Sequence, residues 1–374
     1  MLEAILFILY GVLALIFALG AWRLQYAFKH FQLTPILKSD HSTHKPSVTV
    51  CIPARNEHHA MTECLERVIA SDYPKLEIIV LDDLSGDNTP TLIKAYAHQG
   101  VRFVEGTSLP EGWLGKNHAL QGLIKEASGT YILFMDVDTR IEPDSITQLV
   151  DYAIGQEVLM VSVLPQRVDG RRFSVIFSTL RYFWELMFHR ASSPATTSNA
   201  WMIHRHTLLE RWQGFDSFKD AIQPESRFSA ALMAEGQYRF VMSNPALGIS
   251  YEKKWRSQID TSIRLLFPLL GAQAANGIIA ILDLLILASP LFIIIAGFIT
   301  GFGVHQIIAT VFWLLFAGLY ASYLRRIWKR GWLLGALAWP LVVLQEAVII
   351  GLSIERYLNK KVTWKGRLVR IPKS

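Results

Sequence analysis

The chain has 374 residues, of which 51% are hydrophobic and 18% charged, with 37 Lys and Arg against 31 Asp and Glu. A typical soluble domain carries about 25% charged residues, so this composition excludes a disordered chain and argues against a fully soluble enzyme. The net charge of +6 is too dispersed to indicate a nucleic-acid-binding protein and suits contact with an anionic membrane surface.

The first predicted element is an apolar run at residues 4–22, which holds no charge and is nearly long enough to cross a bilayer. A cleaved signal peptide would need a basic leader, but only Glu3 precedes the run. We therefore expect residues 1–24 to form a retained transmembrane anchor. The first basic residues, Arg23 and Lys29, follow the run, so the positive-inside rule places the next domain in the cytoplasm.

Residues 46–250 predict an α/β domain in that cytoplasmic position. Short apolar runs rich in β-branched residues alternate there with stretches of helical length. Strands separated in this way predict βαβ units and a mostly parallel sheet flanked by helices. The expected strands are residues 48–52, 77–83, 101–104, 131–138 and 157–164.

Polar residues follow several of these strands, where ligands bind in open α/β sheets. The second strand ends in Asp82 and Asp83, and the fourth runs into Asp136-Val137-Asp138. Alternation along an extended segment predicts that Asp136 and Asp138 lie on one side. Such a pair can share Mg²⁺ or Mn²⁺, which also binds diphosphate oxygens. Alternatively, Asp138 caps the next helix and Asp136 is a solvated strand end.

Common nucleotide-binding fingerprints are absent from the sequence. No G-x-G-x-x-G follows a predicted strand, which argues against a dinucleotide-binding Rossmann domain. Gly115-Lys116 looks like the end of a P-loop, but Asn117 replaces the expected Ser or Thr. Pro110 also stands where the first Gly belongs, so the P-loop interpretation fails.

The segment 251–276 predicts a helix lying in the membrane interface, because basic residues and Trp255 adjoin an apolar run there. Further apolar runs of spanning length occupy residues 278–300, 304–324 and 332–352. We therefore expect about three C-terminal membrane helices within residues 277–353, followed by a basic tail at 354–374. The last run contains Pro340, Gln345 and Glu346, so it is alternatively re-entrant or interfacial.

Four ordered motifs resemble a family 2 glycosyltransferase of the GT-A fold. They are P-A-R-N-E at 53–57, D-D-L-S-G-D at 82–87, G-W-L-G-K-N-H-A at 112–119 and F-M-D-V-D-T at 134–139. The resemblance covers about residues 46–250, and four motifs in order are more specific than any one alone. With the flanking apolar runs, the chain looks most similar to the membrane-bound branch that glycosylates hopanoids, carotenoids or ceramide.

The resemblance implies an inverting transfer from a nucleotide-sugar, usually a UDP-sugar. It implies that one group of residues lines the nucleoside pocket, that Lys116 approaches the diphosphate, and that Asp136 and Asp138 bind Mg²⁺ or Mn²⁺ beside the donor. The implied nucleoside-pocket residues are Pro53, Ala54, Glu57 and Asp83. Taken singly, Glu57 could instead cap the first helix and Lys116 could simply be solvated.

The catalytic base departs from the pattern that the resemblance implies. The family usually places an Asp after a Glu at the start of a downstream helix, where this chain has Pro224 and Glu225. We expect Glu225 to be the base, with Asp220 and Asp216 as fallback candidates. The alternative is that Glu225 is a helix-start acid, because proline favours a first turn and acids there are favoured by the helix dipole.

The sequence favours transfer of one sugar over polymer synthesis. Processive synthases of this superfamily carry Q-x-x-R-W, whereas residues 254–258 read K-W-R-S-Q. We expect a multi-pass glycosyltransferase of the cell's inner (plasma) membrane that glycosylates a membrane lipid. The alternatives are a membrane polysaccharide synthase and a catalytically inactive nucleotide-sugar-binding membrane protein.

Overall fold

The computed structural model describes residues 1–31, 45–169, 172–328 and 330–369. The chain forms two compact units, which we describe separately. The sheet unit comprises Phe31–Val168 and His189–Glu252, and the helical unit comprises Met1–His30, Asp169–Phe188 and Lys253–Ile371. The end of the predicted basic tail, residues 370–374, lies outside the described residues.

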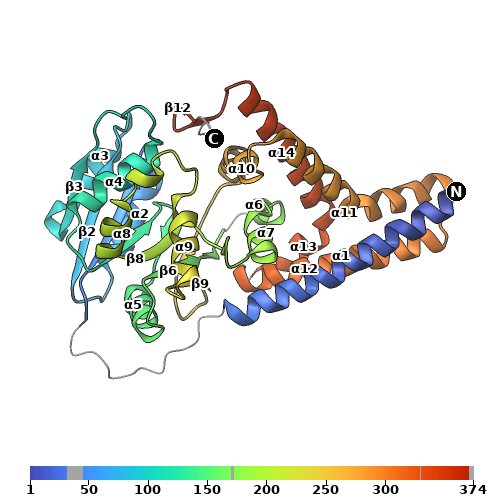
Figure 1. The fold of residues 1–374 in the computed structure, drawn as a ribbon, viewed down its shortest axis with the longest axis horizontal. Helices are drawn as coiled ribbons and strands as arrows, with labels where there is room; N and C mark the ends of the chain where they lie inside the picture. The colour runs from blue at the N-terminus through green and yellow to red at the C-terminus, as the bar shows by residue number, and fades with distance from the viewer. Residues whose placement is uncertain (32–44, 170–171, 329, 370–374) are drawn as a thin grey trace. The chain divides into compact units, whose positions relative to one another are not determined.

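The sheet unit is built on a seven-stranded sheet of order β3-β2-β1-β4-β8-β6-β9 (Figure 1). Neighbours β3, β2, β1 and β4 run parallel, as do β6 and β9, whereas β8 runs antiparallel to both of its neighbours. The sheet is therefore mixed but mostly parallel. Its strands are β1 (Val48–Ala54), β2 (Leu76–Asp82), β3 (Val101–Glu105), β4 (Tyr131–Met135), β6 (Met160–Leu164), β8 (Ala200–His204) and β9 (Tyr238–Met242).

The five predicted strands are present with shifted ends. The first extends to Ala54, the fourth ends at Met135 rather than at residue 138, and the fifth begins only at Met160. Strands β8 and β9 were not predicted from the sequence. The antiparallel β8 lies between β4 and β6, so its position depends on pairing partners far away in the chain.

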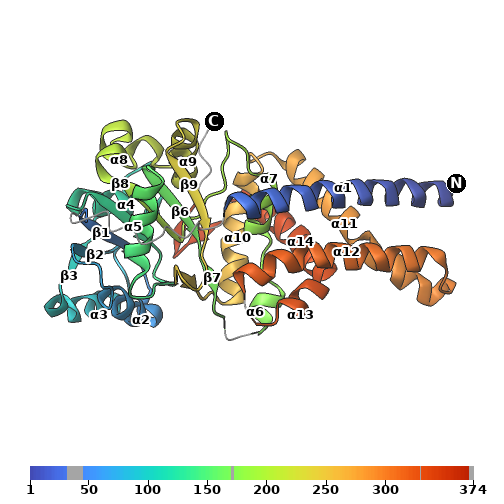
Figure 2. The same cartoon turned by 90° about the horizontal axis from the view of Figure 1, so that it is seen from below.

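Helices flank this sheet, as Figures 1 and 2 show. Helix α4 packs on β1 and β2, α5 on β6, α8 on β8 and α9 on β9. Helix α2 illustrates why these segments are helical, since its buried residues Met61, Cys64, Leu65 and Val68 recur at helical spacing. The helices are α2 (His58–Ile69), α3 (Thr89–Ala95), α4 (Gly115–Glu126), α5 (Ser145–Gly155), α8 (Arg205–Trp212) and α9 (Pro224–Ala234).

A small second sheet continues the chain after β4. Its three strands are β5 (Thr139–Arg140), β10 (Ser250–Tyr251) and β7 (Gln166–Arg167), with β10 in the middle. The backbone that follows the acidic residues at the end of β4 is therefore paired with a strand from the end of the sheet unit.

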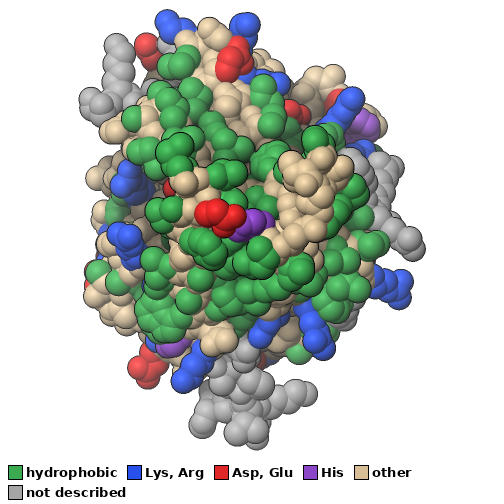
Figure 3. Space-filling model, turned by 90° about the vertical axis from the view of Figure 1, so that its right-hand side faces the viewer, with side chains coloured by type: hydrophobic (Ala, Val, Ile, Leu, Met, Phe, Trp, Pro, Cys, Tyr) green, Lys and Arg blue, Asp and Glu red, His purple; other side chains and the backbone are tan. Residues whose placement is uncertain are grey.

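The helical unit contains three described helices that are long and apolar enough to cross a membrane: α1 (Leu2–His30), α11 (Ala274–Thr300) and α12 (Val304–Ile327). They correspond to the predicted anchor and to two of the three predicted C-terminal runs. Large hydrophobic side chains are exposed along all three helices. Figure 3 shows a face on which hydrophobic side chains predominate.

The third C-terminal run is divided between two helices rather than forming one span. The break falls at Ala338, and Pro340 lies in the first turn of the second helix. These helices are α13 (Trp332–Leu337) and α14 (Trp339–Leu358). The predicted interfacial segment contains α10 (Trp255–Leu269), which packs against α14.

Two short helices and a two-stranded hairpin also belong to the helical unit. Helix α6 (Arg172–Ile176) packs against α13, and α7 (Arg181–Phe188) packs against α1. Near the C-terminus, β11 (Thr363–Trp364) and β12 (Arg367–Leu368) form a hairpin within the predicted basic tail.

Candidate active site

The candidate site lies at the carboxyl ends of β1, β2 and β4, which share one edge of the sheet because these strands are parallel. From β1 the chain proceeds to β2 and β3 on one side, and β4 then pairs on the other side of β1. Such a reversal of strand order is the usual place for a ligand in an open α/β sheet. The loops after β1 and β4 flank this position.

The loop after β1 is tied to the loop after β2. Pro53 and Ala54 are the last residues of β1, and Asn56 follows with a left-handed backbone at φ 51°. Asparagine tolerates this conformation better than most residues. The Asn56 N–H donates to Ser85 Oγ at 2.9 Å, and its Oδ1 accepts the Gly86 N–H at 2.8 Å. The two loops therefore form one rigid wall.

Asp83 is held at the base of this wall and is only 2% exposed. Its N–H donates to the Ala54 carbonyl at 2.8 Å, while the Arg55 guanidinium donates to the carbonyls of Asp83 and Leu84. Neighbouring Asp82 accepts the Ser85 N–H at 3.0 Å. Ala54 and Asp83 are therefore adjacent at this edge of the sheet, and their shared role in a nucleoside pocket stays a prediction.

Glu57 occupies the N-cap position of α2, but its side chain makes no capping hydrogen bond. The alternative that Glu57 serves to cap this helix is therefore wrong. Its backbone N–H donates instead to Thr89 Oγ1 at 2.9 Å. This contact joins the start of α2 to the start of α3.

Asp87, the last residue of the D-D-L-S-G-D motif, organises the same corner. Its carboxylate accepts hydrogen bonds from the Thr89 hydroxyl at 2.5 Å and from His58 Nδ1 at 2.8 Å. Burial alone would raise the pKa of Asp87, but the bonds from Thr89 and His58 prevail and hold it below its ordinary value. Asp87 is therefore a charged anchor of the loop.

Lys116 and Asp136 form an ion pair, with Lys116 Nζ 2.5 Å from Asp136 Oδ1. The two side chains are 30% and 27% exposed, so the pair is partly desolvated and still reachable. The alternative that Lys116 is simply solvated is wrong. Lys116 lies in the first turn of α4, where a cation is disfavoured by the helix dipole, and the pair with Asp136 offsets that cost.

Residues Asp136 to Thr139 form a tight turn, because the Thr139 N–H donates to the Asp136 carbonyl at 2.9 Å. The extended segment assumed from the sequence is not present, so alternation cannot place Asp136 and Asp138 on one side. The helix-cap alternative for Asp138 is also wrong, since β5 follows directly. The turn is fixed by the Asn199 carbonyl, which accepts the Asp136 N–H at 3.0 Å and the Thr139 hydroxyl at 2.9 Å.

Asp138 lies in the electrostatic field of Arg140 and close to the thiol of Cys64. Burial, with a contribution from the Asp138 charge, raises the pKa of Cys64 to about 12, so this thiol stays protonated. Arg140 is anchored by Glu63 at 2.6 Å and 2.7 Å. Lys116 and Arg140 therefore supply positive charge beside Asp136 and Asp138. This positive charge offsets the repulsion between the two carboxylates.

Asp136 and Asp138 would hold a magnesium or manganese ion only together with the phosphate oxygens of a bound substrate. Among the described residues, no group of three or more His, Cys, Asp or Glu side chains could hold a metal ion. Mg²⁺ is usually bound through one or two carboxylates plus substrate phosphates and waters, so Asp136 and Asp138 supply a suitable donor set for it. Mn²⁺ prefers the same oxygen donors.

Glu225 lies in the first turn of α9, directly after Pro224. The predicted helix start at Pro224 is correct, and the Glu225 side chain is buried, with 4% exposure. Both fallback candidates, Asp216 and Asp220, are exposed. Asp216 accepts a hydrogen bond from Gln121 Nε2 at 3.3 Å. Burial therefore distinguishes Glu225 from the two aspartates.

Asn117 connects the Lys116 region to the segment that leads into α9, a role that the sequence analysis missed. Its Nδ2 donates to the carbonyls of Phe218, Lys219 and Ala221 at 3.1, 3.1 and 2.8 Å. Asn117 is 2% exposed, so this clamp is buried. In the sequence, Asn117 is marked only by its position directly after Lys116 in the motif at 112–119. That position does not reveal the three carbonyls that Asn117 contacts in the fold.

Part of the chain is similar in sequence to known glycosyltransferases. Residues 49–212 match the family described as Glycosyl transferase family 2. A "4,4'-diaponeurosporenoate glycosyltransferase" of Staphylococcus aureus (strain N315) is 28% identical over 177 residues, covering 46% of this chain and 45% of the relative. The same-named protein of strain USA300 is 29% identical over 159 residues, covering 41% and 42% of the two chains. The matched region thus spans less than half of either relative's length.

A solved structure shares the fold over nearly the whole chain. A mannosyltransferase from Pyrobaculum calidifontis in complex with GDP-Man and Mn²⁺ superposes with a TM-score of 0.57 and 21% identity, covering 96% of this chain and 99% of that one. The sheet unit therefore has the GT-A fold. Most of the residues that match the glycosyltransferase family, 49–212, lie in this unit.

Proposed function

We propose that this protein is an inverting, metal-dependent glycosyltransferase that moves a single sugar from a nucleotide-sugar, a UDP-sugar, to a membrane lipid. The observation that carries the proposal is the Lys116–Asp136 pair at the end of β4, inside the matched family 2 domain. Three helices of membrane-spanning length in the same chain supply the reason for a lipid acceptor.

The nucleoside of the donor binds to the wall formed by the loops after β1 and β2. Pro53, Ala54 and Glu57 line it on the β1 side, and Asp83 faces the uracil or ribose. Hydrogen bonds between the two loops support this assignment, because they hold the wall in place before the donor arrives. A preformed pocket lowers the entropic cost of binding.

The diphosphate of the donor lies beside Lys116, where negative charge develops as the sugar–phosphate bond breaks. A Mg²⁺ or Mn²⁺ ion held by Asp136 and Asp138 would neutralise part of that charge. The Lys116 ammonium would release Asp136 and bind a phosphate oxygen instead. Fixed positive groups of this kind stabilise the transition state more than the ground state, because the charge is largest there.

Glu225 is the proposed general base. The acceptor hydroxyl oxygen bonds to the anomeric carbon while the bond from that carbon to the diphosphate oxygen breaks, and the hydroxyl proton passes to the Glu225 carboxylate. The diphosphate leaves with the bonding electron pair, and the configuration at the anomeric carbon inverts. Support comes from the burial of Glu225 and from Asn117, which fixes the segment before α9 to the start of α4.

The membrane arrangement is part of the proposal. Residues 1–24 anchor the chain, residues 46–250 form the cytoplasmic catalytic domain, and residues 251–276 lie in the interface. The multi-pass region 277–353 and the basic tail 354–374 complete a protein of the inner (plasma) membrane. The charge pattern supports this orientation, because Arg325 and Arg326 follow α12 directly at its C-terminal end.

The test is to incubate the detergent-extracted full chain with labelled nucleotide-sugars, total membrane lipid and MnCl₂ or MgCl₂, and to identify products by mass. We expect one added hexose on a lipid, lost on chelation of the metal and in the Asp136→Asn variant. A ladder of sugars would instead identify a polysaccharide synthase. Nucleotide binding without turnover of any donor would indicate an inactive binding protein.

A further inference from the structure

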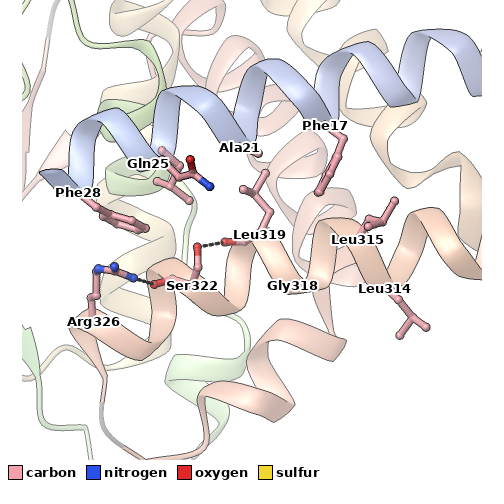
Figure 4. Close-up of a pocket in the computed structure, with 11 residues that line it drawn as sticks. Phe17, Ala21, Gln25, Phe28, Leu314, Leu315, Gly318, Leu319, Ser322 and Arg326 are labelled. Atoms are coloured by element: carbon pink, nitrogen blue, oxygen red, sulfur yellow. Dashed lines mark hydrogen bonds between the residues drawn. The ribbon is translucent and has the colours of Figure 1, made fainter.

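A groove runs between α1 and α12 in the helical unit (Figure 4). Its volume is about 480 Å³, which lies within the range of about 300–1,000 Å³ for small-molecule sites. Most of its lining is apolar, and the few polar side chains gather at one end. The lining residues are Phe17, Ala21, Leu24, Gln25, Phe28, Leu314, Leu315, Gly318, Leu319, Ser322 and Arg326.

Helices α1 and α12 run in the same direction. The polar lining residues lie toward the C-terminal ends of both helices, so the groove has an apolar end and a polar end. Figure 4 shows Phe17 and Leu315 at one end and Phe28 and Arg326 at the other. From Phe17 to Phe28 is 28 − 17 = 11 residues along α1, or about 16 Å at the helical rise. This length is about half of a hydrocarbon core of ~30 Å, so the groove matches one leaflet.

Arg326 is held in a defined position at the polar end. Its Nη1 donates to the Ser322 carbonyl at 2.8 Å, and its guanidinium carbon lies 3.6 Å from the centre of the Phe28 ring. Arginine presents its donors in a planar fork that matches phosphate geometry.

The charges of α1 and α12 also differ between the two ends. Glu3 is the one acidic residue in these two helices, and it pairs with His305 at 3.2 Å at the opposite end. The Arg326 end carries Lys29 and Arg325 in addition and no carboxylate from either helix. The polar end is therefore complementary to an anion.

We infer that this groove binds one acyl chain of an anionic phospholipid from the surrounding bilayer, with the lipid phosphate at Arg326. The apolar walls match the chain, the length matches one leaflet, and the guanidinium matches the head group. This lipid is bound as a structural ligand and is not the sugar acceptor. The inference therefore stands independently of the proposed sugar transfer.

Gly318 and Arg326 provide separate tests of the chain and of the head group. A Cβ added at Gly318 would meet no atom within 4 Å, so Gly318→Leu fills the groove without displacing its walls. Gly11→Leu is the matched control, because Gly11 also has open space, lies in α1 and does not line the groove. Arg325→Gln is the control for Arg326→Gln, since Arg325 is a neighbouring exposed arginine outside the lining.

The experiment is native mass spectrometry of the full chain in detergent with equal amounts of dioleoyl phosphatidylglycerol and dioleoyl phosphatidylcholine. We expect the wild-type chain to retain one phosphatidylglycerol about fivefold more than phosphatidylcholine, the preference that one basic residue near an anionic lipid gives. Arg326→Gln should abolish the preference and Arg325→Gln should keep it. Gly318→Leu should lower retention of both lipids severalfold relative to Gly11→Leu.

Two results would overturn the inference: an unchanged phosphatidylglycerol preference in Arg326→Gln, or equal lipid retention in Gly318→Leu and Gly11→Leu. Circular dichroism of each variant measures its helix content, and only variants with the helix content of the wild-type chain are compared. No sugar donor is present in the experiment, so its outcome does not depend on whether the protein transfers sugar.

Discussion

The two units of the chain expose different kinds of side chain. In the sheet unit the strands are apolar and buried, and charged groups such as Lys116 and Asp136 meet at strand ends. In the helical unit large apolar side chains face outward, with Ile299 87% and Ile307 66% exposed, while Gln306 is buried. Monomeric soluble proteins rarely expose such continuous apolar surface, so the helical unit has the surface of a membrane-associated structure.

The difference also assigns separate tasks to the two units. A charged donor such as a nucleotide-sugar needs the ion pairs and polar loops that water-facing strand ends provide. A lipid needs the apolar helix surfaces. In the proposed function, joining both in one chain lets the enzyme combine a soluble donor with an acceptor that stays in the membrane. Variants confined to one unit should therefore affect one substrate and leave the other function intact.

The largest effect should come from Glu225→Gln, which keeps the shape of the side chain and removes its ability to accept a proton. We expect the transfer rate to fall by about 10²–10⁴, the usual contribution of a general base, with donor binding unchanged. Initial rates with a labelled donor measure it. Asp216→Asn and Asp220→Asn are matched comparisons, and a larger loss in either of them would move the base to that residue.

Asp136→Asn should come next, because it removes the partner of Lys116 and one of the two proposed metal ligands. We expect the rate to fall by about 10²–10³, as when an electrostatic contact to a transition state is lost. Asp144→Asn serves as control, since Asp144 is exposed at the start of α5 and its side chain makes no capping hydrogen bond. Rates that match between the two variants would refute the role of Asp136.

Asn117→Ala should reduce both stability and rate, because three carbonyls lose their buried donor. Leaving buried polar groups unsatisfied costs about 1–3 kcal/mol in the free energy of unfolding. Thermal unfolding and transfer rates measure the two effects. Asn88→Ala is the control, because Asn88 is exposed and its side chain makes no capping bond. Wild-type behaviour of Asn117→Ala would show that the clamp does not matter.

The smallest effect concerns the pH dependence of stability through Asp87. The folded state lowers the pKa of Asp87 below its ordinary value of 3.8, so it binds fewer protons there than the unfolded chain does. The stabilisation is complete above that value and is lost as the pH falls below it. Asp87→Asn should lower the melting temperature at pH 7 by a few degrees and flatten its fall below about pH 4. An unchanged acid profile would contradict this origin.

The strands of the sheet unit were predictable because their apolar, β-branched runs carry a local signal. The fold class followed from the alternation of these runs with stretches of helical length, and the helix start at Pro224 from the preference of proline for a first helical turn. The turn at Asp136–Thr139 was not, since it is fixed by the carbonyl of Asn199, about sixty residues away. The partners of Asn117 lie about a hundred residues away. Contacts of this range leave no periodicity in the sequence.

In the helical unit the apolar length of α1, α11 and α12 was readable directly, because spanning a bilayer requires a run of that length. The division of the third C-terminal run at Ala338 was only hinted at by Pro340. The groove beside Arg326 could not be predicted, because it depends on how two helices distant in sequence pair.

The central claim is that Lys116 and Asp136 receive the diphosphate of a nucleotide-sugar. Titration calorimetry of UDP into the full chain with MnCl₂ tests it most directly, using wild type, Lys116→Gln and Asp136→Asn. We expect each variant to weaken UDP binding by about tenfold or more, because Lys116→Gln loses a charge-assisted contact to phosphate and Asp136→Asn loses one proposed ligand of the metal ion. Equal dissociation constants for all three proteins would contradict it.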